Sequence, residues 1–273
     1  LSTNSIGLRG PEILDKPITG TSRIICFGDS ITLGHGVGDG ETYSAVLEKR
    51  LRETGLNAEV VNAGTHRYDS GKMLVLLREL ITLKPAVVTI CPGVNDTIGQ
   101  EEHSNPALFS LDLTDERYDE VLSLFRQNLR DFVSFARENG AETVFIVPPV
   151  SSTFPFPDFA KYAKEILSLA TELNIPILNL ESLFSQEERR DGLVLVADGS
   201  THKLVTYMDG KAQTVFEAPR NHGGRNLISD EIYDFLDSQP FSQRLSITST
   251  HPNEEGHRLI AESLLPIMTN LLQ

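Results

Sequence analysis

RIICFGDSIT, residues 23–32, is the stretch that decides the fold of this 273-residue chain. Residues 24–27 are an apolar run typical of a buried strand, and Gly28-Asp29-Ser30 follows it with the residues of a turn. Open α/β sheets keep their reactive groups at the carboxyl ends of strands, which makes Ser30 a candidate nucleophile. The alternative is that Asp29 and Ser30 cap a following helix. This stretch alone leaves both interpretations open.

The composition is that of an ordinary globular chain, with 40% hydrophobic and 23% charged residues. The net charge of -14 argues against partners bound through their phosphates, so we expect neither nucleic acid nor an anionic membrane surface. Cys26 and Cys91 both lie in apolar runs, cannot form a disulfide framework and lack metal-site spacing. We therefore expect buried thiols, no metal site and no cofactor.

Helices and strands alternate along most of the chain. Helical periodicity covers residues 41–54, 70–83, 114–139 and 159–173, and strand-like runs after the first cover residues 59–62, 86–91, 143–147 and 175–178. This alternation predicts a three-layer α/β/α sandwich with a doubly wound, five-stranded parallel sheet. The glycine-rich segment 33–40 lacks the lysine of a phosphate loop, and we expect it to form a mobile rim beside Ser30.

The predicted organisation is an extended lead-in at residues 1–22 and a single domain at 23–273. The alternation ends near residue 190, where three strand-like runs are separated by Asp198-Gly199 and Asp209-Gly210. They predict a small antiparallel meander, inserted at about 190–245, that could serve as a lid, a binding surface or an oligomer contact. Its end is predicted to be helical at 230–236, and the chain then returns through 245–250 to a closing helix.

Polar residues occur where predicted strands end and where the last helix begins: Ser30, Asn62-Ala63-Gly64, Asn95 and His251. Parallel strands present their carboxyl ends to one crevice, so these residues can converge although they are far apart in the sequence.

The chain resembles the SGNH hydrolase superfamily, also called GDSL esterases and lipases. The resemblance rests on four blocks in the family order: Gly28-Asp29-Ser30, Asn62-Ala63-Gly64, Gly93-Val94-Asn95-Asp96 and His251-Pro252-Asn253. It extends from about residue 23 to the closing helix and implies a flavodoxin-like SGNH fold. Residues 7–12 are also similar to segments that precede the first motif in bacterial members.

The resemblance implies a role for each block. Ser30 would attack an ester carbonyl while a neutral His251 removes its proton. The backbone N–H groups of Ser30 and Gly64 and the amide of Asn95 would form the oxyanion hole. Structural alternatives are a turn residue for Asn95, a hinge for Gly64 and a helix start for His251. His257 falls inside the predicted helix, and we expect the other histidines to be solvated: His35, His66, His103, His202 and His222.

The chain departs from the family pattern at the acid that orients the histidine. That acid normally lies three residues before the histidine, where this chain has Thr248. A Ser-His dyad could use the Thr248 hydroxyl or a backbone carbonyl instead, or Asp198 or Asp209 could supply the carboxylate. A binding-only descendant is a further alternative.

A second departure is His66-Arg67, where the family commonly has a glycine-containing turn. Arg67 would either contact an acidic or phosphorylated substrate or pair with a surface carboxylate. Tyr68 could shape the acyl pocket.

The leading functional hypothesis is a serine hydrolase that cleaves carboxylic esters through a Ser30 acyl-enzyme. The expected substrate carries a short acyl or acetyl group on a carbohydrate or small molecule. An O-acyltransferase with the same Ser30 and His251, and a non-catalytic carbohydrate-binding protein, are the alternatives.

Localisation is the least determined property of the chain. No apolar run reaches about 18 residues, so we expect no transmembrane segment. The first residue is Leu1 and not methionine, which is compatible with removal of a signal peptide or anchor. We favour a soluble bacterial protein outside the cytoplasm over a cytoplasmic one.

Overall fold

A five-stranded parallel sheet forms the centre of the computed structural model, which describes residues 1–96, 115–149, 159–191, 193–198, 201–208, 211–219 and 251–273. Its strands lie in the spatial order β2-β1-β3-β4-β5, so the first strand along the chain is an interior strand, between β2 and β3. All four strand pairings are parallel. The bounds are β1 (Ser22–Gly28), β2 (Ala58–Gly64), β3 (Val87–Cys91), β4 (Glu142–Val147) and β5 (Ile177–Asn179).

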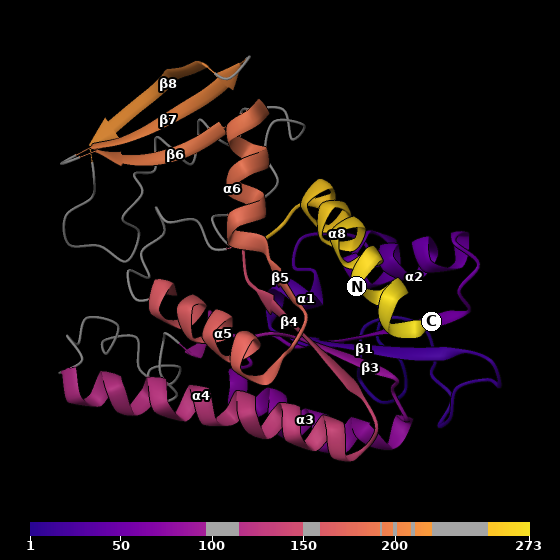
Figure 1. Cartoon of the computed structure of the whole chain (residues 1–273). Helices are drawn as coiled ribbons and strands as arrows, with labels where there is room; N and C mark the ends of the chain where they lie inside the picture. Colours follow the sequence, from indigo (N-terminus) through magenta and orange to yellow (C-terminus); the bar gives the residue numbers. More distant parts are fainter. Residues whose placement is uncertain (97–114, 150–158, 192, 199–200, 209–210, 220–250) are drawn as a thin grey trace.

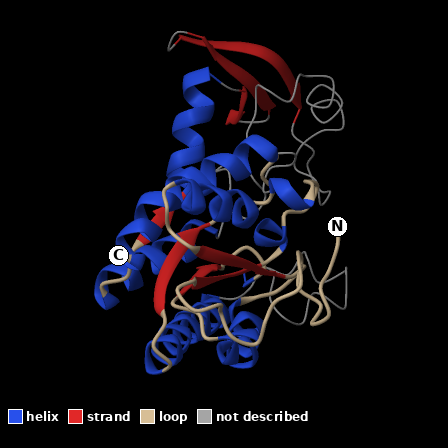
Figure 2. Cartoon of the chain, turned by 90° about the vertical axis from the view of Figure 1, so that its right-hand side faces the viewer, coloured by secondary structure: helices blue, strands red, loops and turns tan. Residues whose placement is uncertain are grey.

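Helices cover both faces of this sheet, as Figures 1 and 2 show. One layer contains α3 (Ser70–Leu80), α4 (Asp115–Glu138) and α5 (Phe159–Leu173). The other contains α2 (Tyr43–Glu53), α6 (Leu180–Asp191) and α8 (Glu254–Leu272). The predicted three-layer sandwich and its sheet are therefore confirmed. The short elements are α1 (Ser30–Leu33), η1 (Asp39–Glu41) and η2 (Ile81–Leu83).

Two hydrophobic cores lie between these layers, because successive side chains of a strand point to opposite faces of the sheet. Ile25 and Phe27 of β1 pack against the α3, α4 and α5 layer, and the Phe27 ring contacts Phe132 edge to face at 5.4 Å. Ile24 and Cys26 pack against the opposite layer. The expected buried thiols are confirmed, since both Cys26 and Cys91 are free and buried.

A separate three-stranded antiparallel sheet follows α6. Its strands are β6 (Leu193–Asp198), β7 (Thr201–Met208) and β8 (Lys211–Pro219), in that spatial order. Figure 1 shows it beyond the end of α6, away from the five-stranded sheet. Each predicted strand-like run lies within one of these strands. The predicted helix at 230–236 and the return strand at 245–250 lie outside the described residues.

The lead-in segment is packed into the domain and does not only cross its surface. Asn4, Leu8 and Arg9 are buried, and Arg9 forms an isolated bridge with Asn62 of β2. The segment therefore reaches the carboxyl end of β2, beside the end of β1 that precedes Ser30. Among the described residues, no helix has the length and apolarity needed to cross a membrane.

Candidate active site

Ser30 is the first residue of a short helix that begins directly after β1. Asp29 is the N-cap of that helix, and its Oδ1 accepts a hydrogen bond of 2.8 Å from the Ile31 N–H. Gly28 is needed at the turn, because a Cβ there would lie 2.0 Å from Thr32 Oγ1. The two interpretations of this stretch are therefore compatible: Asp29 caps α1, and the cap presents Ser30 at the carboxyl end of the sheet.

His251 lies beside Ser30, although 221 residues separate them in the chain. Ser30 Oγ and His251 Nε2 are 2.8 Å apart, and a neutral ring with its proton on Nδ1 would accept the serine proton at Nε2. Asn253 caps α8 just beyond, where its Oδ1 accepts a 2.9 Å hydrogen bond from the Gly256 N–H. This cap fixes the start of the helix that follows His251.

Two further imidazoles lie near the His251 ring. The ring centroid of His35 lies 4.9 Å from that of His251 and 5.2 Å from that of His66. Burial, followed by the neighbouring His35 and His66, lowers the pKa of His251 to about 4. Burial also lowers the pKa of His66, with His35 as the second cause. His251 is therefore neutral, and able to accept a proton, well below pH 7.

Sequence reasoning placed His35 and His66 in solvent and did not bring them to the site. Both side chains are exposed, as expected, yet they line the approach to His251. Their positions in the sequence could have predicted this, because His35 and His66 come shortly after the first and second motif blocks, which end β1 and β2. Gly28 lies opposite Gly64 in the sheet, so the segments that leave these strands are neighbours.

Asn95 follows β3 and lies against the turn that carries Ser30. Its Nδ2 donates to Asp29 Oδ2 at 2.9 Å and to the Tyr68 carbonyl at 3.2 Å. Asp29 is buried, and burial is the main reason why its pKa rises to about 7. The amide of Asn95 is thereby held in one orientation beside Ser30.

Gly64 allows α1 to approach β2 closely. A Cβ at this position would lie 2.1 Å from the Leu33 backbone nitrogen and 2.5 Å from the Thr32 carbonyl carbon. Its N–H donates to Asn62 Oδ1 at 3.0 Å. An oxyanion role for this N–H would require it to leave Asn62, whereas the need for glycine is explained by packing.

Arg67 and Tyr68 belong to one tight turn that follows β2. The Tyr68 N–H donates to the Thr65 carbonyl at 3.3 Å, and Arg67 has a φ of 61°, in the left-handed region. Tyr68 is partly buried and packs against the core beneath α3, α4 and α5, while Arg67 is exposed. The family's glycine-containing turn is thus replaced by an arginine in a conformation that favours glycine.

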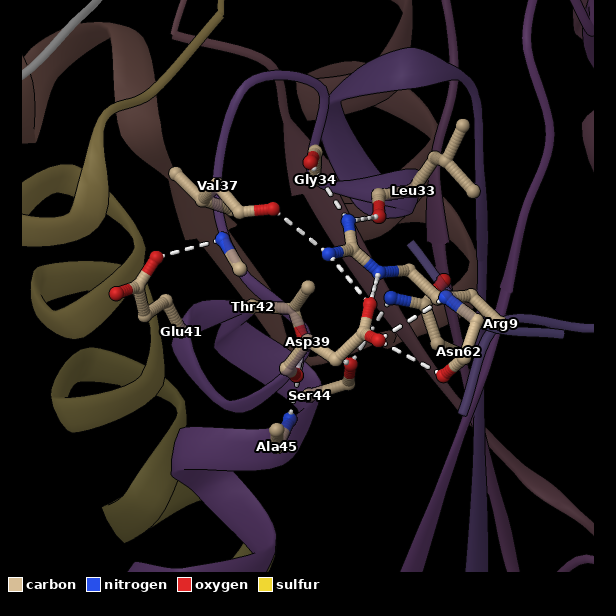
Figure 3. Close-up of polar contacts among 12 residues, drawn as sticks. Arg9, Leu33, Gly34, Val37, Asp39, Glu41, Thr42, Ser44, Ala45 and Asn62 are labelled. Carbon is tan, nitrogen blue, oxygen red and sulfur yellow. Dashed lines mark hydrogen bonds and ion pairs between the residues drawn. The ribbon is translucent and has the colours of Figure 1, made fainter. Parts of the chain in front are cut away.

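Arg9 holds the glycine-rich segment beside Ser30 in place, which corrects the expectation of a mobile rim (Figure 3). Its Nη1 donates to the carbonyls of Leu33 and Gly34 and its Nη2 to that of Val37, each at 2.7 Å. Its Nε donates to Asp39 Oδ1 at 2.8 Å. One buried guanidinium therefore satisfies three loop carbonyls and a carboxylate, and fixes the segment that carries His35.

Asp96 connects the third motif block to α3. Its carboxylate accepts hydrogen bonds from the Ser70 hydroxyl and N–H and from the Gly93 N–H. Burial is the main cause that raises its pKa to about 6. Asp96 therefore braces the turn on which Asn95 lies.

His257 has a structural position in α8. Its ring is fully buried, and Nδ1 accepts a 3.1 Å hydrogen bond from the Tyr43 N–H at the start of α2. Burial lowers its pKa to about 3. This neutral ring joins the first turn of α2 to α8.

Several predicted residues cannot be placed. Thr248, Asp209, His103 and His222 lie outside the described residues, and the side chains of Asp198 and His202 are not described. Within the described ranges, no group of three His, Cys, Asp or Glu side chains is arranged to hold a metal ion.

Comparison with known families identifies one match over most of the chain. The model of the GDSL-like lipase/acylhydrolase family matches residues 26–259. This range includes Ser30, Asn95 and His251. No curated protein sequence matches the chain.

Solved structures with the same fold include several hydrolases. A putative lipolytic protein of the G-D-S-L family from Desulfitobacterium hafniense DCB-2 is 18% identical, with a TM-score of 0.55 over 90% of this chain and 99% of that one. The acetyl xylan esterase AlAXEase is 16% identical, with a TM-score of 0.55 over 90% and 98%. The psychrotrophic esterase EstA from Pseudoalteromonas sp. is 16% identical, with a TM-score of 0.52 over 92% and 98%. At these identities, the likeness shows the fold alone.

Proposed function

The chain belongs to the GDSL-like lipase/acylhydrolase family, and from this premise we propose that it is a serine hydrolase that cleaves carboxylic esters through an acyl-enzyme on Ser30. The observation that carries the proposal is the 2.8 Å contact between Ser30 Oγ and His251 Nε2. A serine hydroxyl is a weak nucleophile near neutral pH unless a base removes its proton. His251 lies within hydrogen-bond reach and has the low pKa that keeps it neutral.

The proposed reaction has two steps. Ser30 Oγ bonds to the ester carbonyl carbon as its proton passes to His251 Nε2, and that proton then leaves with the alcohol when the ester C–O bond breaks. Water next attacks the acyl-enzyme, gives a proton to His251, and releases the acid as Ser30 regains its hydrogen. No other reactant is required.

The negative charge that develops on the carbonyl oxygen needs donors that are already oriented. The backbone N–H of Ser30, at the start of α1, is the donor that the geometry supports best. Asn95 Nδ2 is the second donor, and it would have to release the Tyr68 carbonyl, since its two N–H groups donate to that carbonyl and to Asp29 Oδ2. We retain Gly64 as a third donor only if its N–H leaves Asn62 Oδ1 when the substrate binds. Asp29 would keep the Asn95 amide oriented during both steps.

We propose a short acyl group, such as acetyl, on a carbohydrate or other small molecule as the substrate. Support comes from the fold shared with a protein described as an acetyl xylan esterase. The position of Tyr68 is consistent with a short acyl group. Its side chain packs against the core beside the turn and can limit the space for the acyl chain.

A series of p-nitrophenyl esters of increasing acyl length tests this function. We expect hydrolysis to be fastest for acetate or butyrate and to be lost in Ser30→Ala, with loss of labelling by a fluorophosphonate probe. Ser182→Ala is the matched control, because that serine is exposed on α6 and its hydroxyl accepts a hydrogen bond from Gln186 on the same helix. Unchanged hydrolysis in Ser30→Ala would overturn the proposal, and so would absence of both hydrolysis and labelling in the wild-type protein.

A further inference from the structure

A continuous line of imidazoles leads from the surface to the nucleophile. His66 contacts His35, His35 contacts His251, and His251 contacts Ser30. His35 and His66 are exposed, and His35 lies in the segment that Arg9 fixes through three carbonyls. The rings of His35 and His66 therefore form one edge of the site.

Arg67 lies between His66 and Tyr68 in the sequence and gives this turn a permanent positive charge. Its neighbour His66 contacts His35, and its other neighbour, Tyr68, accepts a hydrogen bond from Asn95 through the backbone carbonyl. The turn that carries Arg67 is thus anchored to the site on both sides. The left-handed φ of 61° costs a non-glycine residue roughly 1 kcal/mol, so the surrounding contacts impose this conformation.

Arg67 has no carboxylate partner among the described residues, which is unusual in so acidic a chain. Within the described ranges, no carboxylate forms an ion pair with Arg67, His35 or His66, although the chain has a net charge of -14. Asp69, two residues further on, pairs instead with Lys72 at 2.8 Å and caps α3. Ion pairs do occupy most other described arginines: Arg9, Arg23, Arg50, Arg52, Arg126, Arg130 and Arg258.

We propose that Arg67, His35 and His66 form an anion subsite at the mouth of the Ser30–His251 pair, which selects esters that carry a carboxylate beside the scissile acyl group. This inference rests on the proposed esterase function and names its substrate class. The guanidinium would bind the carboxylate through paired N–H donors, and the imidazoles would supply further N–H groups. The Arg67 charge would attract anionic substrates to a molecule with a net charge of -14.

Two substrates that differ only in charge test the subsite. The acetyl ester of a methyl glucuronoside carries the carboxylate, and the acetyl ester of the matching uronamide does not. We expect the wild-type kcat/KM to favour the charged ester by about tenfold, and Arg67→Gln to remove most of this ratio. Raising the salt to about 0.5 M should also reduce the ratio, because the screening length falls to roughly 4 Å.

Lys84→Gln is the matched control for Arg67→Gln. Both cations are exposed and both have a left-handed φ, 61° for Arg67 and 56° for Lys84. Lys84, however, precedes β3 and lies at the opposite end of the parallel sheet from Arg67, which follows β2. We expect Lys84→Gln to keep the wild-type ratio, and thermal melting should show that both variants are folded.

The outcomes separate the subsite from the hydrolase function. Ser30-dependent hydrolysis with no charge preference, or with the same preference in Arg67→Gln, overturns the subsite and leaves the esterase proposal standing. Calorimetric binding of the deacetylated glucuronoside and its uronamide to Ser30→Ala gives a readout without turnover. Tighter, Arg67-dependent binding of the charged compound supports the subsite even if no ester is cleaved, and equal binding of the two compounds overturns it.

Discussion

Asn95 Nδ2 donates a 2.9 Å hydrogen bond to Oδ2 of Asp29, the residue that immediately precedes the proposed nucleophile. The same carboxylate accepts the Ile31 N–H through Oδ1, so one buried side chain orients both α1 and the amide of Asn95. Asn95 also reaches the Tyr68 carbonyl. The turns after β1, β2 and β3 are thereby joined into one unit around Ser30.

Replacement of Asn95 by alanine should remove a proposed oxyanion donor together with its hydrogen bonds to Asp29 and Tyr68. We expect Asn95→Ala to lower kcat by about a hundredfold to a thousandfold with a smaller effect on KM, because the donor acts on charge that develops in the transition state. Steady-state kinetics on the best p-nitrophenyl ester would measure it. Asn139→Ala is the control, since Asn139 is exposed and its Nδ2 donates to the Phe135 carbonyl at 2.9 Å, outside the network around Ser30. A loss below threefold in Asn95→Ala would remove Asn95 from the oxyanion hole.

The pH dependence of hydrolysis should report the low pKa of His251. Because the base must be neutral, and its pKa is about 4, kcat/KM should stay nearly constant from pH 7 to about pH 5. It should then fall as His251 becomes protonated. His35 is one of the neighbours that lower the pKa of His251, so replacing His35 by glutamine should move this acidic limb to higher pH. Circular dichroism at each pH confirms that the protein is folded, and a limb near pH 6.5 in the wild-type protein would contradict the assignment.

Gly64→Ala should destabilise the fold, because the new Cβ would meet backbone atoms of Leu33 and Thr32 that cannot rotate away. We expect the free energy of unfolding to fall by about 2–3 kcal/mol, as for other overpacked sites. Gly40→Ala is a matched control, since a Cβ there has no heavy atom within 4 Å and φ is not in the left-handed region. Urea denaturation should separate the two variants, and equal stability would show that α1 can move away from β2.

Loss of the Arg9 guanidinium should release the segment that carries His35. We expect Arg9→Met to lower the free energy of unfolding by about 3 kcal/mol, because three loop carbonyls and Asp39 lose a buried donor. The same substitution at Arg52, whose pair with Glu48 is largely exposed on the arginine side, should cost less than about 1 kcal/mol. Thermal melting would compare the stabilities of Arg9→Met and Arg52→Met. Limited proteolysis should show faster cleavage within residues 34–38 in Arg9→Met only. Similar melting of the two variants would contradict this role for Arg9.

The sheet could be predicted from the sequence because its strands are short apolar runs with clear ends. Two examples are residues 143–147 and 86–91. Their β-branched side chains favour a buried strand. By contrast, α6 was not predicted. Its sequence LESLFSQEERRD contains mostly polar residues, and its buried apolar side chains are Leu180 and Phe184, too few to produce a helical period.

The site was predicted in part, and the limit has a physical cause. Ser30, Asn95 and His251 follow motif blocks, and the structure brings all three together. The roles of Arg9 and His35 depend on contacts between segments that no local pattern connects. Arg9 reaches Asp39 across 30 residues, and His35 meets His66 only because β1 and β2 are neighbours in the sheet.

The 221-residue separation of Ser30 and His251 also determines when the site can form. A ribosome releases the β1 turn and its serine early, and N-terminal parts of a chain generally fold first. His251 is made only just before α8, so for most of its synthesis a nascent chain would hold Ser30 without its proposed base. Hydrolytic activity would therefore appear only late in folding, and its onset could be used to measure the rate of the final folding step of this protein.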